Sequence, residues 1–69
     1  MDVAITNYRQ ALRDDSNLLS AHYGLGEALE RKGDLDAALK EYEKVVRDMP
    51  EFQSYREARD RLWKQTRSR

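Results

Sequence analysis

Apolar side chains recur along this chain every three or four residues, which is the spacing that places them on one face of an α-helix. Two sets of positions show the same steps of four, three and one residues: Ala4, Tyr8, Ala11 and Leu12 in the first set, and Ala38, Tyr42, Val45 and Val46 in the second. The two sets lie 34 residues apart. The pattern therefore predicts an internal repeat built from helices.

Start and stop signals divide the chain into predicted helices at about 2–14, 18–32, 35–48 and 52–65. We expect Ser16 or Asn17 to cap the second helix, because their side-chain oxygens can accept hydrogen bonds from its first amides. Gly33 is expected to end that helix in the left-handed conformation, and Pro50 to stop the third helix. The connections are short, which favours antiparallel neighbours in an all-α fold.

Gly26 lies in the middle of the second predicted helix, where glycine costs about 1 kcal/mol relative to alanine. A close approach of the third helix would explain its presence. We therefore expect Gly26 and Ala38 to meet where the two backbones cross, with larger side chains on either side.

The stretch from Leu19 to Phe52 resembles one complete tetratricopeptide repeat, and residues 1–18 resemble the second half of a preceding one. The resemblance depends on these positions: Ala4, Tyr8, Ala11, Leu25, Gly26, Leu29, Gly33, Ala38, Tyr42, Val45 and Pro50. It implies antiparallel helix hairpins stacked as a short solenoid. The last helix has Arg59 and Asp60 where a repeat would have Leu and Gly, which favours a terminal cap.

This resemblance implies a single domain over residues 1–65. Its parts are a half repeat at 1–18, a full repeat at 19–52 and a capping helix at 53–65, and a disordered basic tail follows at 66–69.

In proteins similar to this one, the first helices of successive repeats line a concave surface that holds a peptide or a partner protein. The resemblance places the following residues on that surface: Ser20, Tyr23, Gly24, Glu27, Glu30 and Arg31, continued by Ser54, Glu57 and Arg61 on the last helix. Tyr23 is a rigid anchor of the kind enriched at binding hot spots. Gly24 would allow a ligand backbone to approach, and Glu27 and Glu30 favour a ligand that carries Lys or Arg.

Other interpretations stay open at this point. The same positions are also those of ordinary exposed helix residues. The chain could serve only as the structural cap of a longer repeat array. A third alternative is a nucleic-acid adaptor, because Arg61, Lys64, Arg67 and Arg69 accompany Trp63 in a segment without acidic residues.

Composition argues against most other classes. Charged residues make up 38% of the 69 residues and balance to a net charge of zero, so the chain lacks the field that attracts DNA or anionic membranes. With no cysteine and only one histidine, we expect no metal site and no cofactor. His22 has no nucleophile or carboxylate pair to serve, so it is expected to be a partly buried structural residue and the chain is not expected to be an enzyme.

No apolar run approaches the roughly 20 residues that a membrane span needs. The compartment stays open, with the cytoplasm favoured.

The first predicted helix has no partner helix before it. We expect the outer side of Ile5, Tyr8 and Leu12 to be uncovered, and an exposed apolar stripe tends to find a partner. The chain would then be cut from a longer array, which we favour, or form a homo-oligomer through this helix.

Overall fold

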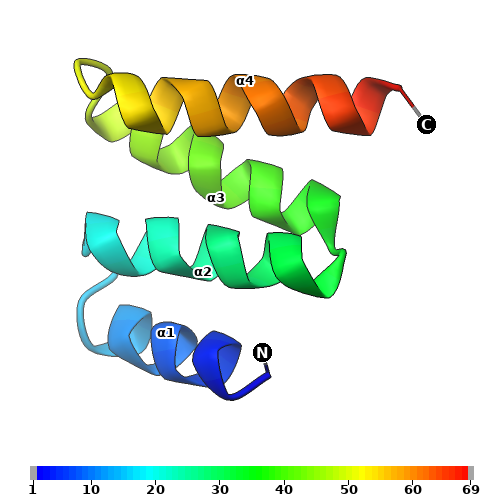
Figure 1. The fold of residues 1–69 in the computed structure, drawn as a ribbon. Coiled ribbons are helices and arrows are strands. Elements are labelled where there is room, and N and C mark those ends of the chain that lie inside the picture. Colours follow the sequence, from blue (N-terminus) through cyan, green and yellow to red (C-terminus); the bar gives the residue numbers. More distant parts are fainter. Residues whose placement is uncertain (1, 69) are drawn as a thin grey trace.

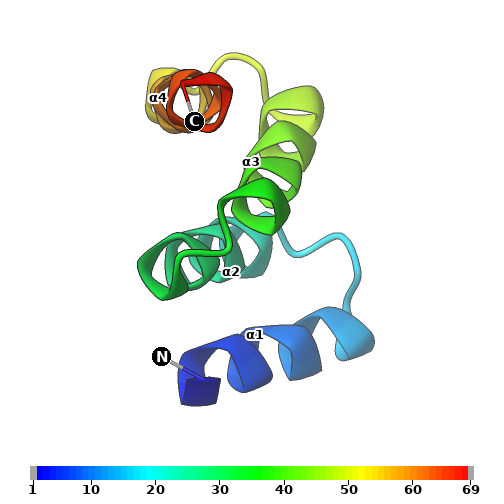
Figure 2. The same ribbon diagram turned by 90° about the vertical axis from the view of Figure 1, so that its right-hand side faces the viewer.

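The computed structural model describes residues 2–68, and within this range the chain is helical without strands. The helices are α1 (Asp2–Asp14), α2 (Leu19–Lys32), α3 (Leu35–Asp48) and α4 (Gln53–Arg67). Successive helices run in opposite directions, and each packs against the next (Figure 1). After a quarter turn, α2 and α4 lie on the same side of α3 (Figure 2). The all-α prediction of stacked antiparallel hairpins is confirmed.

The connection between α2 and α3 depends on Gly33, which has a φ of 95° in the left-handed region. Its N–H donates to the Glu30 carbonyl at 3.0 Å, and the Asp34 N–H donates to the Leu29 carbonyl at 2.9 Å. These bonds satisfy carbonyls that the end of a helix leaves without partners, and a residue with a Cβ would be strained at this φ. The predicted end of the second helix is confirmed.

The start of α2 differs from the prediction. The position before its first turn is Leu18, which has an extended backbone and makes no side-chain capping bond. Ser16 and Asn17 lie in the preceding turn, where the Asn17 N–H donates to Asp15 Oδ1 at 3.1 Å. The prediction that Ser16 or Asn17 caps α2 was wrong, because an aspartate two residues earlier organises the turn and the helix begins after it.

The last helix is longer than predicted. It runs to Arg67, so Thr66 and Arg67 belong to α4 and not to a disordered tail. The Ser68 hydroxyl donates to the Lys64 carbonyl at 2.7 Å and so occupies one of the carbonyls at the helix end. Arg69, the last residue of the predicted tail, lies outside the described residues.

One apolar core runs through all the helices. Its buried members are Ile5, Leu25, Ala28, Leu29, Ala38, Tyr42, Ala58 and Leu62. Because Ile5 is only 5% exposed and Tyr8 and Leu12 are half-buried against this core, the stripe on α1 is turned toward α2. The prediction of an uncovered stripe was wrong for Ile5, which α2 covers, whereas Tyr8 and Leu12 stay partly exposed on the side away from α2, and self-association through this helix stays a prediction. The exposed large apolar side chain of α1 is Val3.

Two glycines bring α2 close to both of its neighbours. A Cβ on Gly26 would lie 2.7 Å from Cε1 of Tyr42 in α3, and a Cβ on Gly24 would overlap the ring of Tyr8 in α1. Residues two apart point to nearly opposite sides of a helix with 3.6 residues per turn, so α2 is approached from both sides. The close approach predicted at Gly26 is present, but the Tyr42 ring, and not Ala38, supplies the nearest atoms.

Candidate functional site

Four aromatic rings form a continuous row that joins α2, α3 and the start of α4. The ring centroids of Tyr42 and Tyr23 are 5.4 Å apart, those of Tyr23 and Tyr55 are 5.0 Å apart, and those of Tyr55 and Phe52 are 5.3 Å apart. Tyr42 is fully buried, Tyr23 and Tyr55 are half-buried, and Phe52 is 45% exposed. This aromatic row therefore begins in the core and reaches the surface.

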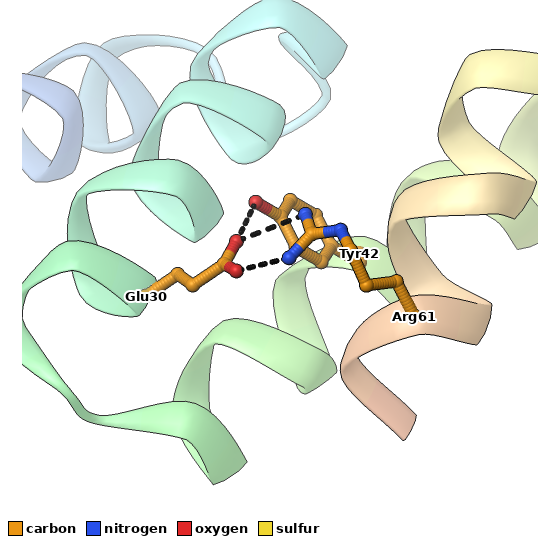
Figure 3. A network of polar contacts seen from close by, with 3 residues as sticks. All are labelled: Glu30, Tyr42 and Arg61. Atoms are coloured by element: carbon orange, nitrogen blue, oxygen red, sulfur yellow. Dashed lines mark hydrogen bonds and ion pairs between the residues drawn. The ribbon is translucent and has the colours of Figure 1, made fainter. Parts of the chain in front are cut away.

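A polar network lies beside the row and connects α2, α3 and α4 (Figure 3). The Tyr42 hydroxyl donates to Glu30 Oε1 at 3.0 Å, and Arg61 Nη2 donates to the same oxygen at 3.2 Å. Arg61 Nη1 forms an ion pair with Glu30 Oε2. Both carboxylate oxygens of Glu30 are thus occupied by donors from the chain itself.

The network changes the acidity of its members. The hydrogen bond from Arg61 lowers the pKa of Glu30 below its ordinary value, so the carboxylate is charged at neutral pH. Burial, followed by the hydrogen bond to Glu30, raises the pKa of the Tyr42 hydroxyl well above its ordinary value. Tyr42 therefore keeps its proton at neutral pH and can donate to the charged Glu30 carboxylate.

The predicted surface residues do not all lie together. Tyr23 and Glu30 contact residues of α4, while Ser20, Glu27 and Arg31 are exposed on α2. Burial, followed by the charge of Glu27, raises the pKa of the Tyr23 hydroxyl, which shows that Glu27 lies near the aromatic row.

Gly24 is buried, and its missing side chain makes room for the ring of Tyr8. A ligand backbone could not approach at that position without displacing Tyr8.

Sequence reasoning missed two members of the row. Phe52 and Tyr55 were not predicted to lie on the candidate surface, and in α4 Ala58 and Leu62 are buried while Tyr55 is half-buried. The available signal was the presence of two aromatic residues, three positions apart, shortly after Pro50.

His22 of α2 is buried, and polar contacts of its ring link α2 to α3 and to the turn before α2. Its Nδ1 atom lies 2.6 Å from Glu41 Oε1 on α3, and its Nε2 atom lies 2.8 Å from the carbonyl oxygen of Ser16, before α2. Both ring nitrogens are therefore engaged within the chain. This agrees with the expected structural role, although the two polar partners could not be predicted.

A second surface feature lies between α3 and α4, away from the aromatic row. Glu43, Arg59, Asp60 and Trp63 line a depression of about 320 Å³. The guanidinium of Arg67 lies 4.6 Å from the centre of the Trp63 ring, and Arg59 pairs with Asp60 at 2.9 Å. Arg59 and Arg67, two of the basic residues near Trp63, thus have partners within the chain.

Comparison with curated proteins and with solved structures found no significant match. No helix within residues 2–68 is both long enough and apolar enough to cross a membrane. A family model described as tetratricopeptide repeat matches residues 1–54, which include α1, α2, α3 and the turn into α4. Together with the repeated helix pattern and the stacked antiparallel hairpins, this match shows that the chain belongs to the tetratricopeptide repeat family.

Proposed function

We propose that the chain is a protein-interaction module that holds a peptide segment of a partner protein on the surface shared by α2 and α4. The observation that carries the proposal is the aromatic row, whose exposed end joins these two helices at Tyr23, Tyr55 and Phe52. Rigid aromatic side chains supply a large contact area at low entropic cost, which is why they are enriched at binding hot spots.

The charge around the row supports a partner with Lys or Arg. Of the two acidic residues predicted for this role, Glu30 has both oxygens occupied by Arg61 and Tyr42. Glu27 is exposed and close enough to Tyr23 to affect its pKa. Glu27 is therefore the residue that we expect to receive the positive charge of a ligand.

The test is a titration of the isotope-labelled chain with peptides that carry one Lys or Arg, followed by chemical shifts. We expect the changes to cluster on residues 20–31 and on the first two turns of α4. Glu27→Lys should weaken the binding in a salt-dependent manner, because a positive charge on the surface repels the ligand. Glu43→Lys is the matched control, since it makes the same charge change on the other face. Equal losses in both variants would contradict the proposed surface.

A purely structural cap is the second candidate, and one observation favours it. Arg59, Asp60 and Trp63 occupy the positions 34 residues after Leu25, Gly26 and Leu29. The Arg59–Asp60 ion pair and the half-exposed Trp63 replace the apolar and small residues on which α3 packs against α2. A cap would close the end of a stack at α4. The same titration separates the candidates, because a cap would show no clustered shifts on α2 with any peptide.

A further inference from the structure

We propose that the segment held by the aromatic row is proline-rich, binds as a polyproline II helix and carries a Lys or Arg that pairs with Glu27. This inference rests on the proposed function and specifies the class of partner. Three features of the surface lead to it: the side-chain contacts that join α2 and α4, the spacing of the exposed rings, and the free hydroxyls beside them.

The first feature excludes other modes of peptide binding. The helices α2 and α4 contact each other directly through the Tyr23 and Tyr55 rings, 5.0 Å apart, and through the bond from Arg61 to Glu30. A helical ligand needs an open groove for a rod about 10 Å across, and these side-chain contacts cross the space between α2 and α4, which disfavours that mode. A ligand that adds a β-strand needs an open sheet edge, and residues 2–68 contain no strand.

The second feature is the spacing of the rings. From Tyr23 to Phe52 the row takes steps of 5.0 and 5.3 Å, and the neighbouring rings are tilted by 33° and 56°. A polyproline II helix repeats after three residues, or about 9 Å. One turn of such a helix therefore matches the distance that the exposed rings cover, and such helices dock on aromatic surfaces.

The third feature is a set of hydrogen-bond donors without partners. Among residues 2–68, neither the Tyr23 nor the Tyr55 hydroxyl bonds to another residue, and no buried side-chain polar atom there lacks a partner, so both hydroxyls are open to the surface. A tyrosine hydroxyl keeps its proton at neutral pH, and burial and the charge of Glu27 raise the pKa of Tyr23 further. A polyproline II helix has no internal hydrogen bonds, and its carbonyl oxygens are free acceptors. Donors on the surface thus match acceptors on the ligand.

The test compares two peptides by chemical-shift titration of the intact chain. The probe is an oligoproline of about nine residues with one Lys at its end, which makes about three turns. The reference peptide has the same length and the same Lys, with Gly and Ser in place of proline. We expect the oligoproline to bind at least about tenfold more tightly, with shifts at Tyr23, Tyr55 and Phe52. Equal affinity for the two peptides would overturn the preference for proline.

The two proposals fail in different ways. If the reference peptide shifts residues 20–31 and the oligoproline does not, the surface is a peptide site and the inference about proline is wrong. If neither of these peptides, nor any of the other Lys or Arg peptides, produces clustered shifts on α2, the proposed function is wrong as well.

Matched variants sharpen the result. Phe52 and Trp63 are each 45% exposed, but only Phe52 belongs to the aromatic row. Phe52→Ala should weaken oligoproline binding by about fivefold or more, whereas Trp63→Ala should leave it unchanged. Tyr55→Phe removes a hydroxyl without removing the ring and should weaken binding less than Phe52→Ala does. Equal effects of Phe52→Ala and Trp63→Ala would overturn the assignment to the row, and circular dichroism confirms that each variant is folded.

Discussion

Two tyrosines that occupy equivalent positions in the repeat make the same contact in different surroundings. Tyr42 and Tyr8 lie 34 residues apart, and each places its ring against a glycine of α2. The ring of Tyr42 is fully buried between α2 and α4, and its hydroxyl donates to Glu30. Tyr8 is half-buried, because α1 packs against α2 without a helix on its other side. Equivalent positions in the repeat thus make the same contact with a glycine of α2. We expect this contact to contribute more to the free energy of unfolding at Tyr42, which is fully buried, than at Tyr8, which is half-buried.

The largest effect should come from removing the two rings. Tyr42→Ala leaves a cavity in the core and should cost about 3 to 5 kcal/mol in the free energy of unfolding. Tyr8→Ala removes a ring that water already reaches and should cost about 1 to 2 kcal/mol. Urea unfolding followed by circular dichroism measures both values. Equal losses would show that α1 contributes as much to the core as α3, contrary to the comparison.

We expect a smaller difference in the free energy of unfolding when the alanines at equivalent positions of α3 and α1 are replaced by leucine. Ala38 is fully buried, so Ala38→Leu should overpack the contact between α2 and α3 and cost about 1 to 3 kcal/mol. Ala4 is the equivalent residue of α1 and is half-buried, so Ala4→Leu should change stability by less than about 0.5 kcal/mol. Thermal unfolding of the two variants side by side tests this. Glu43→Leu, at an exposed position of α3, serves as a control.

Alanine substitutions at Gly26 and Gly24 test whether the neighbouring rings of Tyr42 and Tyr8 can move away from an added Cβ. Alanine favours a helix over glycine by about 1 kcal/mol, so the result depends on the neighbouring ring. Tyr42 is held by the core and by Glu30, so Gly26→Ala should still lower stability, by about 1 kcal/mol. Tyr8 meets Gly24 with the outer part of a half-exposed ring that can swing away, so Gly24→Ala should be nearly neutral. Urea unfolding should therefore give a lower midpoint for Gly26→Ala than for Gly24→Ala. The reverse order would refute this account.

The smallest effect concerns the acidic partner that Tyr42 has and Tyr8 lacks. The pKa of Glu30 is lowered in the folded state, chiefly by the hydrogen bond from Arg61. Its contribution is therefore fully present above the unfolded carboxyl pKa and is lost as the pH falls through the lowered folded value. At pH 7 we expect Glu30→Gln to cost about 0.2 to 1 kcal/mol, because Arg61 is mostly exposed. The difference between wild type and variant should shrink toward pH 3 in urea titrations, and a constant difference would argue against this role of the ion pair.

The fold was predictable from the sequence because its determinants are local or periodic. Gly33 is the one glycine with a positive φ, and such a residue marks a helix end whatever lies around it. The 34-residue repeat then placed Ala38, Tyr42 and Val45 on one buried face. Local rules failed before α2, where the Asp15 side chain accepts a hydrogen bond from the Asn17 amide and the expected caps are not used, and at the end of α4, which runs on to Arg67.

The candidate site was less predictable, because its contacts join residues that are distant in the sequence. Glu30 and Arg61 are 31 residues apart in the sequence. Both were expected to contact a ligand, and their contact with each other was not predicted. Gly24 was assigned to the surface because the resemblance gives the helix face but not the ring of Tyr8 that covers it. The binding role of Tyr23 and Glu27 stays a prediction, since exposure and charge do not identify a partner.

The glycines on the two sides of α2 also bear on how the chain folds. Each costs about 1 kcal/mol of helix propensity, so a peptide with the sequence of α2 alone should be poorly helical in water. The helix at the centre of the stack therefore depends on the rings of its neighbours for its own order. Losing either neighbour weakens it, so the segments should unfold in one cooperative step, although each belongs to a repeat that looks self-contained.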